Sequence, residues 1–245
     1  MKVFLAGTYS RERLFRDELP KPKYILESFY YVKPWQIKRM AEWEMFLLDS
    51  GAFTFMSGTS GAIDWKSYID RYCDFITQNN IKYFFELDID SIVGYEKVKQ
   101  IRSYIEDRTG RPCIPVWHKS RGIDDFVKTA ECYDYMAVGG IVTKEIKRVE
   151  WPYFSSLINI AHKNKCKIHG LGFTATKELH KYHFDSVDST KWLSASRFGQ
   201  IQIFKDGCIQ QVKTPDGKKT VHYHKTDDFI FGEWIKFQRY AETNL

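Results

Sequence analysis

The sequence lacks the cysteine spacing of a disulfide framework or of a compact zinc site. Its five cysteines are scattered and odd in number, and no two of them are spaced as Cys-x-x-Cys. This pattern argues against both structures and indicates a reducing, cytosolic setting. The cysteines are Cys73, Cys113, Cys132, Cys166 and Cys208.

Long apolar runs and targeting signals are also missing. No apolar stretch approaches the length of a membrane span, and the amino terminus begins directly with the strand-like run Val3-Phe4-Leu5-Ala6-Gly7. No repeat, low-complexity tract or linker divides the chain. We therefore expect a single cytoplasmic domain with no membrane partner.

The composition is that of a globular protein with a slight positive charge. Of the 245 residues, 43% are hydrophobic and 16% aromatic, enough for a sizeable core. The aromatic content also suits base stacking, although an ordinary core is the commoner explanation. The net charge of +6 permits a polyanionic partner without requiring one, because small basic clusters are usually solvated helix faces.

Apolar runs alternate with helix-like segments along the chain. This alternation favours a single (β/α)8 barrel over a doubly wound sheet. The eight predicted strands are residues 3–6, 45–48, 81–87, 113–117, 135–138, 167–170, 184–187 and 200–204. The predicted helices are residues 34–43, 65–79, 95–107, 123–132, 152–164, 174–183 and 229–240. We assign residues 1–207 to the barrel and 208–245 to a small hairpin and a closing helix, and read residues 24–28 only as a short extended segment.

Carboxylates follow several of these strands, and barrel enzymes hold their reacting groups at the carboxyl ends of strands. Asp49 follows four apolar residues and precedes Ser-Gly, so it is either a proton-transferring carboxylate or the cap of a turn. Asp88 and Asp90 flank Ile89 after another apolar run. Such a pair can bind a metal ion or the amide edge of a purine, or simply cap the next helix.

Other candidates lie at the ends of later strands. His118 could be a base, a ligand or a structural histidine, and no histidine spacing supports a zinc centre. Gly139 and Gly140 would let backbone N–H groups approach a planar ligand, or form a tight turn. Gly170 begins the turn Gly-Leu-Gly, which lacks the spacing of known phosphate-binding loops.

The run Phe184-Asp185-Ser186-Val187-Asp188 ends the most informative part of the chain. In a regular strand Asp185 and Asp188 point to opposite faces. One of them can therefore face the barrel mouth as a nucleophile or acid–base group while the other supports the structure.

Taken together and in this order, these motifs resemble the tRNA-guanine transglycosylase family, which exchanges guanine for 7-deazaguanines in nucleic acid. The resemblance covers about two thirds of the chain, from Asp49 to Gly207. It rests on Asp49-Ser50-Gly51-Ala52-Phe53, Tyr135-Met136-Ala137-Val138-Gly139-Gly140-Ile141, His169-Gly170-Leu171-Gly172, Phe184-Asp185-Ser186-Val187 and Arg197-Phe198-Gly199-Gln200 with Lys205-Asp206-Gly207. The second of these is similar to the family's Tyr-Ala-Val-Gly-Gly-Leu and the third to its Met-Gly-Val-Gly.

The chain departs from the family in three places. His118 stands where the family has a glutamine, the cysteine-rich zinc subdomain is absent, and the chain is short. Because the zinc subdomain helps the family grip tRNA, its absence favours DNA, and the short phage-type enzymes that modify DNA are the nearest comparison. The resemblance implies a bacteriophage-type enzyme in the host cytoplasm, with a 7-deazaguanine such as preQ0 as second substrate and a homodimer or accessory protein as possible partner.

The resemblance also implies roles for individual residues. Asp185 would attack C1′ of a guanosine and form a covalent sugar–enzyme intermediate, and Asp49 would be the general acid and base. The base would be held by Phe53, Asp88 or Asp90, His118, Gly139, Gly140 and Gly170. Phosphates would be contacted by Lys119, Arg121, Lys144 and Arg197. No metal or organic cofactor is required.

Four alternatives remain open from the sequence. The same exchange could act on tRNA, water could replace the incoming base in a nucleoside N-glycosidase, or the barrel could bind nucleic acid without catalysis. A metal-dependent hydrolase using Asp88, Asp90 and His118 is the fourth.

Overall fold

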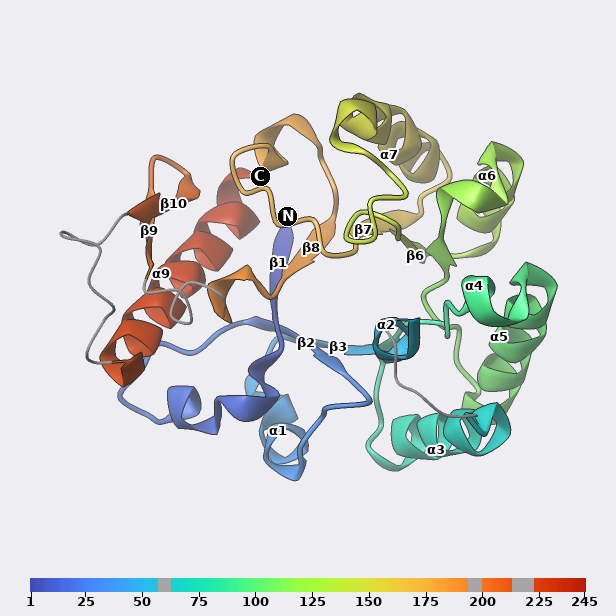
Figure 1. The fold of residues 1–245 in the computed structure, drawn as a ribbon, viewed down its shortest axis with the longest axis horizontal. Helices are drawn as coiled ribbons and strands as arrows, with labels where there is room; N and C mark the ends of the chain where they lie inside the picture. Colours follow the sequence, from blue (N-terminus) through green and yellow to red (C-terminus); the bar gives the residue numbers. More distant parts are fainter. Residues whose placement is uncertain (57–62, 194–199, 213–222) are drawn as a thin grey trace.

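The chain forms an α/β barrel of eight parallel strands, as expected for a (β/α)8 fold (Figure 1). The structure is a computed structural model, and it describes residues 1–56, 63–193, 200–212 and 223–245. The strands follow one another in the order β4-β3-β2-β1-β8-β7-β6-β5. Their bounds are β1 Lys2–Ala6, β2 Tyr24–Ser28, β3 Met45–Asp49, β4 Tyr83–Phe84, β5 Val116–Trp117, β6 Tyr135–Val138, β7 Lys167–Gly170 and β8 Ser186–Ser189.

Alternate residues of each strand serve two separate cores. Phe4 and Ala6 of β1 point into the barrel, where they pack with residues such as Leu47, whereas Val3 and Leu5 pack outward beneath the helices. Because both faces of a parallel barrel are covered, its strands are continuous apolar runs, and this is why most of them could be recognised in the sequence.

Helices surround the strands and are bounded by ordinary capping residues. Asp64 accepts a hydrogen bond from the Ser67 amide at the start of α3, and Gly110 ends α5 in the left-handed conformation. The helices are α1 Pro34–Arg39, α2 Ala52–Met56, α3 Trp65–Gln78, α4 Asp90–Val93, α5 Tyr95–Thr109, α6 Ile123–Cys132, α7 Phe154–Lys163 and α9 Tyr223–Asn244. Short 3-10 helices occupy Thr8–Ser10, Glu12–Phe15, Met40–Glu42, Lys119–Arg121, Arg148–Tyr153 and Leu179–Lys181.

The ring closes at a seam between β4 and β5 that has few strand-to-strand hydrogen bonds. A single bridge joins Phe85 to Ile114. Beyond it the carboxylate of Glu86, which is fully buried, accepts a hydrogen bond of 2.9 Å from the Val116 amide. The Glu86 side chain therefore joins the two strands beyond the point where their backbone pairing ends.

Two predicted elements of the barrel were wrong. The eighth strand is β2, at 24–28, and not residues 200–204. Those residues belong to a separate antiparallel hairpin of β9 (Ile201–Lys205) and β10 (Cys208–Val212), whose turn lies at Asp206-Gly207. Residues 174–183 form turns and one 3-10 turn, and not the predicted α-helix. The hairpin therefore begins at 201, earlier than the assigned boundary at 208, and residues 213–222 of the assigned segment 208–245 lie outside the described residues.

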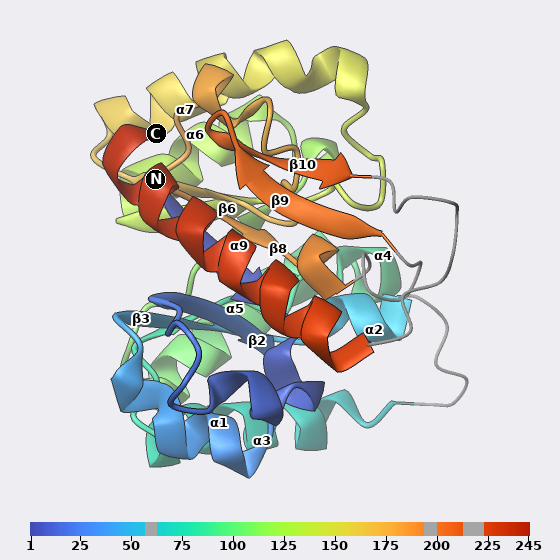
Figure 2. The same cartoon turned by 90° about the vertical axis from the view of Figure 1, so that its left-hand side faces the viewer.

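The closing helix α9, near the carboxyl end of the chain, is hydrogen-bonded to residues at the amino end. Gln238 of α9 is buried and donates hydrogen bonds to the backbone oxygens of Val3 and Tyr24. The amino-terminal nitrogen of Met1 donates to the oxygen of Ala241. Figure 2 shows α9 running along the side of the barrel, with both termini at one end and α2 and α4 at the other. Among the described residues, no helix combines the length and apolar character needed to cross a membrane.

Candidate functional site

Three carboxylates from distant parts of the chain meet at the carboxyl ends of the strands. Asp49 is the last residue of β3, Asp88 follows β4, and Asp188 is the third residue of β8. Asp49 has the same parity as Leu47, which points into the barrel, so its carboxylate also faces inward. These residues are separated by up to 139 positions in sequence and are brought together only by the closed ring.

Asp49 is the carboxyl group with the most altered acidity. Burial, followed by the negative charge of Asp88, raises the pKa of Asp49 from 3.8 to about 7, and Asp188 and Glu27 add to the effect. A hydrogen bond of 3.2 Å from the Gly51 amide to Asp49 Oδ2 opposes the rise without cancelling it. A carboxyl group with this pKa can both give and take a proton near neutral pH.

Asp188 is held by two donors on one oxygen. Its Oδ1 accepts a hydrogen bond of 2.6 Å from the Gly172 amide and one of 3.2 Å from His169 Nε2. Gly172 has a φ of +67°, and a Cβ at this position would lie 2.3 Å from Val142 Cγ2, so the turn needs glycine. Oδ2 makes no hydrogen bond with any described residue and is the oxygen left available for chemistry.

Asp185 is not part of this group, which corrects the role given to it by the resemblance. It precedes β8, and its backbone oxygen bonds the amide of Lys2, the first residue of β1, so it lies at the amino end of the barrel. Its side chain also points outward, where Oδ2 accepts from the Ile168 amide at 2.8 Å and lies 2.9 Å from His162 Nε2 of α7. Asp188 comes three residues later, so it lies towards the opposite end of the strand and on its opposite face.

His118 joins two carboxylates at the same end of the barrel. Its Nε2 lies 3.2 Å from Asp88 Oδ2 and its Nδ1 lies 3.0 Å from Glu145 Oε2. Burial disfavours the charge, but the hydrogen bonds and charges of Asp88 and Glu145 outweigh it and raise the pKa of His118 to about 9. His118 is therefore an imidazolium at neutral pH.

Gly139 and Gly140 provide the space that this arrangement needs. A Cβ on Gly139 would lie 2.7 Å from His118 Cε1, and one on Gly140 would lie 2.8 Å from Glu145 Oε2. The two glycines thus accommodate the histidine and its carboxylate partner. Their predicted role as backbone contacts to a base stays a prediction.

Asp90 and Arg121 form a separate, structural group. Arg121 is almost fully buried and pairs with Asp90 and Glu86, while its guanidinium lies 4.2 Å from the ring centroid of Tyr95. Asp90 therefore does not share the position of Asp88, and the trio of Asp88, Asp90 and His118 expected for a metal-dependent hydrolase is not assembled. The expectation that Arg121 contacts phosphate is wrong as well, because buried carboxylates occupy its guanidinium.

The remaining predicted residues differ in their availability. Phe53 lies on α2 directly after Asp49 and is 51% exposed, so its ring is free to stack. Gly170 is buried at the end of β7, where a Cβ would lie 3.2–3.3 Å from Phe173 and Phe184, so it serves packing. Lys119 is exposed but paired with Glu150, and Lys144 is exposed. Arg197 lies outside the described residues.

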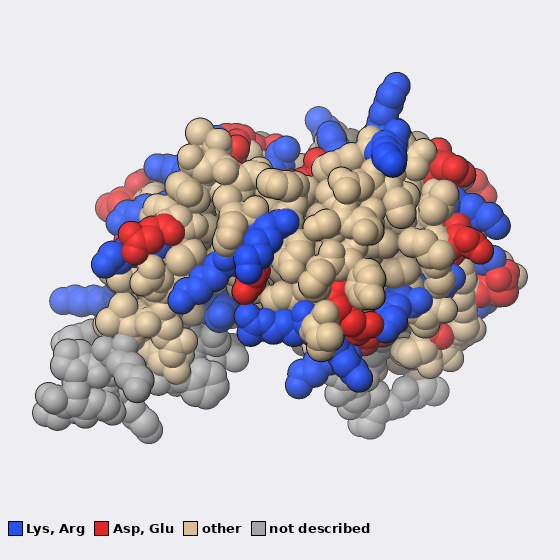
Figure 3. Space-filling view, turned by 90° about the horizontal axis from the view of Figure 1, so that it is seen from above, with Lys and Arg blue, Asp and Glu red and all other residues tan. Residues whose placement is uncertain are grey.

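Exposed cations follow β6 and β7, next to the carboxyl ends of the strands. They are Lys144, Lys147, Arg148 and Lys177. In Figure 3 a band of Lys and Arg side chains crosses the lower part of the face seen from above, broken by a few acidic groups. A polyanion could follow such a margin to the carboxylates.

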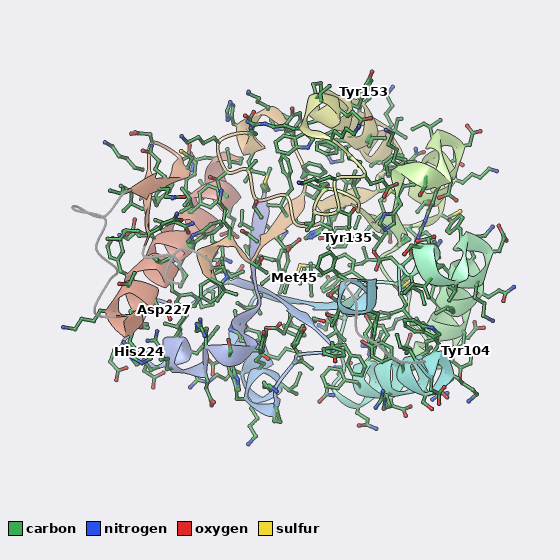
Figure 4. All side chains as sticks on the ribbon, viewed as in Figure 1. Met45, Tyr104, Tyr135, Tyr153, His224 and Asp227 are labelled. Carbon is green, nitrogen blue, oxygen red and sulfur yellow. The ribbon has the colours of Figure 1, made fainter. Side chains whose placement is uncertain are left out.

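The amino end of the barrel carries a different feature. A pocket of about 830 Å³ lies there, lined by residues that include Tyr83, Ile114 and Tyr135. Figure 4 places Tyr135 and Met45 near the centre of the ring of strands. None of Asp49, Asp88, His118 and Asp188 lines this pocket. Within the described ranges, no group of three or more His, Cys, Asp or Glu side chains is arranged to hold a metal ion.

Sequence reasoning missed three members of the site. Asp188 could have been chosen over Asp185 from its distance along the strand, since only the later residue reaches the carboxyl end. His169 was recognised as part of a motif but not as the partner of Asp188. Glu145 carried no sequence signal, because its contact with His118 crosses 27 residues.

Comparison with known proteins adds no relative to these observations. No protein-family model matches the chain, and no curated protein matches it. The geometry of the carboxyl end therefore supplies the argument about function.

Proposed function

We propose that the protein is a guanine transglycosylase that exchanges a guanine in nucleic acid for a 7-deazaguanine. The observation that carries the proposal is the pairing of Asp188, whose Oδ2 is left available, with Asp49, whose pKa is raised to about 7. Two carboxyl groups with separate environments, one with an unoccupied oxygen and one able to carry a proton near neutral pH, suit displacement at a sugar C1′.

In the proposed reaction Oδ2 of Asp188 forms a bond to C1′ as the bond from C1′ to N9 of guanine breaks. The bonding electron pair goes to the departing guanine, which receives a proton from Asp49. The incoming 7-deazaguanine loses its N9 proton to Asp49 and then displaces Asp188 from C1′. Two displacements retain the configuration of the sugar and restore both carboxyl groups.

The groups around the carboxylates suit recognition of a guanine-like edge. The carboxylate of Asp88 can accept from ring N–H and amino groups, while the imidazolium of His118 donates to Asp88 and Glu145 and so holds that carboxylate in place. Phe53 can cover the face of the base. A guanosine must leave its stack to reach this end of the barrel, and the exposed cations after β6 and β7 can hold the flanking phosphates. DNA is the polymer that we propose first, and tRNA is the alternative.

The test is incorporation of radiolabelled guanine into double-stranded DNA, single-stranded DNA and unmodified tRNA. Asp188→Asn and Asp185→Asn are the matched pair, since both remove one negative charge from adjoining parts of the chain. We expect label in DNA with wild type and Asp185→Asn, and none with Asp188→Asn. Loss of activity in Asp185→Asn with normal activity in Asp188→Asn would refute the assignment of the nucleophile.

The same assay separates the alternatives. Label entering only tRNA would keep the chemistry and change the polymer. Release of free guanine without incorporation would identify an N-glycosidase that uses water. Binding of nucleic acid with neither exchange nor release would favour the non-catalytic barrel.

A further inference from the structure

A buried chain of hydrogen bonds crosses the inside of the barrel from its amino end to Asp188. The Tyr135 hydroxyl bonds Ser186 Oγ, and Ser186 Oγ lies 2.7 Å from His169 Nδ1. His169 Nε2 in turn lies 3.2 Å from Asp188 Oδ1. His169 is fully buried, and its ring packs against Phe85 and Phe4 with centroids 5.4 and 6.0 Å away.

The direction of the chain follows from its two ends. Burial raises the pKa of the Tyr135 phenol, which therefore keeps its proton and can donate it to Ser186 Oγ. The Ser186 hydroxyl is then free to donate to Nδ1 of His169. The remaining ring nitrogen, Nε2, then carries the hydrogen and can donate it to Asp188 Oδ1, which lies 3.2 Å away.

We propose that His169 is a positioning residue that holds Asp188 in its reactive orientation, and that Ser186 and Tyr135 fix the imidazole tautomer that makes this possible. Together with the Gly172 amide, His169 saturates Oδ1 and directs Oδ2 towards the open end of the barrel. The proposal rests on the proposed function for its catalytic consequence only, since the tautomer and the contact can be observed in an inactive protein.

A side chain without a donor could not perform this role. In the family that the sequence resembles, the matching motif has a methionine in place of His169. A thioether cannot donate a hydrogen bond, so this chain has a feature that its motif did not predict. The interior of a barrel is otherwise filled with apolar layers, and a polar chain there needs every member to be satisfied.

The first test observes the tautomer directly, without any substrate. Nitrogen-15 NMR of histidine-labelled protein resolves protonated and unprotonated ring nitrogens, and His169→Gln identifies the signals of this residue among the seven histidines. We expect a protonated Nε2 and an unprotonated Nδ1 in His169, with a change at Nε2 in Asp188→Asn. A protonated Nδ1 with an unprotonated Nε2 would overturn the proposal.

The second test measures the exchange reaction in four variants. His169→Leu removes the donor and should lower kcat on the order of 10- to 100-fold with little change in the KM for guanine, because His169 does not touch the base. His169→Gln keeps a donor and should recover most of that loss. Ser186→Ala and Tyr135→Phe should give smaller decreases.

The two tests distinguish the possible failures. A folded His169→Leu protein with wild-type kcat would refute the positioning role, and circular dichroism checks that it is folded. If wild type performs no exchange, the proposed function fails, and the NMR result alone decides whether the hydrogen-bonded chain exists. If His169→Leu does not fold, Ser186→Ala and Tyr135→Phe test the role in its place, and wild-type kcat in both would refute it.

Discussion

The raised pKa of Asp49 predicts a pH-dependent loss of stability that a single substitution should remove. In the unfolded chain the carboxyl group ionises near 3.8, whereas in the folded protein it keeps its proton up to about 7. The folded state therefore binds the extra proton between these values, and the unfolding free energy falls as the pH rises through that window. The total loss is about 4 kcal/mol, and about 2.6 kcal/mol of it falls between pH 5 and pH 8.

Asp49→Asn cannot ionise and should not show this loss. Urea unfolding followed by tryptophan fluorescence at half-unit steps from pH 5 to pH 8 gives the unfolding free energy of each protein. We expect the difference between variant and wild type to grow in favour of the variant by about 2–3 kcal/mol over this range. Asp107→Asn, at an exposed position on α5, is the control and should follow wild type. A difference between Asp49→Asn and wild type that does not change with pH would refute the account of Asp49.

The other predictions concern groups around the carboxylates. His118 has a pKa raised from 6.5 to about 9, so its contribution to stability is complete below pH 6.5 and lost as the pH rises through 9; the stability advantage of wild type over His118→Gln should shrink by up to about 3 kcal/mol between pH 6 and pH 10 in the same urea assay. Gly139→Ala should displace the His118 ring and flatten that pH dependence, and an unchanged profile would contradict the 2.7 Å clash. Arg121→Ala should cost about 3 kcal/mol of unfolding free energy, because Asp90 loses its partner and the buried Glu86 keeps only Arg102, whereas Arg148→Ala at the surface should cost less than about 1 kcal/mol. Normal stability with weakened nucleic-acid binding in Arg121→Ala would restore its role as a phosphate contact.

The fold could be predicted from the sequence where strands are buried on both faces. Runs such as Phe46-Leu47-Leu48 have no polar interruption, and they were recognised. Residues 201–205 were wrongly placed in the barrel because Ile201, Ile203 and Phe204 resemble a strand of the barrel, and Gln202 is itself buried, where it accepts a hydrogen bond from Trp234 Nε1. The true strand at 24–28 contains Glu27, which its hydrogen bonds to Thr8, Tyr9 and Gln36 make acceptable in a buried position. Those partners are invisible without the fold.

The site could be predicted only in part, because its residues are distant in sequence and become neighbours only when the barrel is formed. Asp49, Asp88 and His118 follow strands and were found from position alone. The choice between Asp185 and Asp188 needed the start of β8, since one residue at the boundary decides which end of the barrel a side chain occupies. The motif resemblance favoured Asp185 because it compares only residue types and their order. The length and alternation of the strand determine where each side chain points.

The seam between β4 and β5 is a weak point of the barrel, because few backbone hydrogen bonds join the two strands. Its backbone ladder is reduced to the bridge of Phe85 with Ile114, so the sheet should separate there before it unfolds elsewhere. Asp88 and His118 stand on opposite sides of this line and face each other across it. A base bound beside Asp88 and His118 would bridge the two edges, and amide exchange at Glu86 and Ile114 would then report occupancy of the site from outside it. Local opening of this weakly paired seam would therefore show whether a ligand is bound.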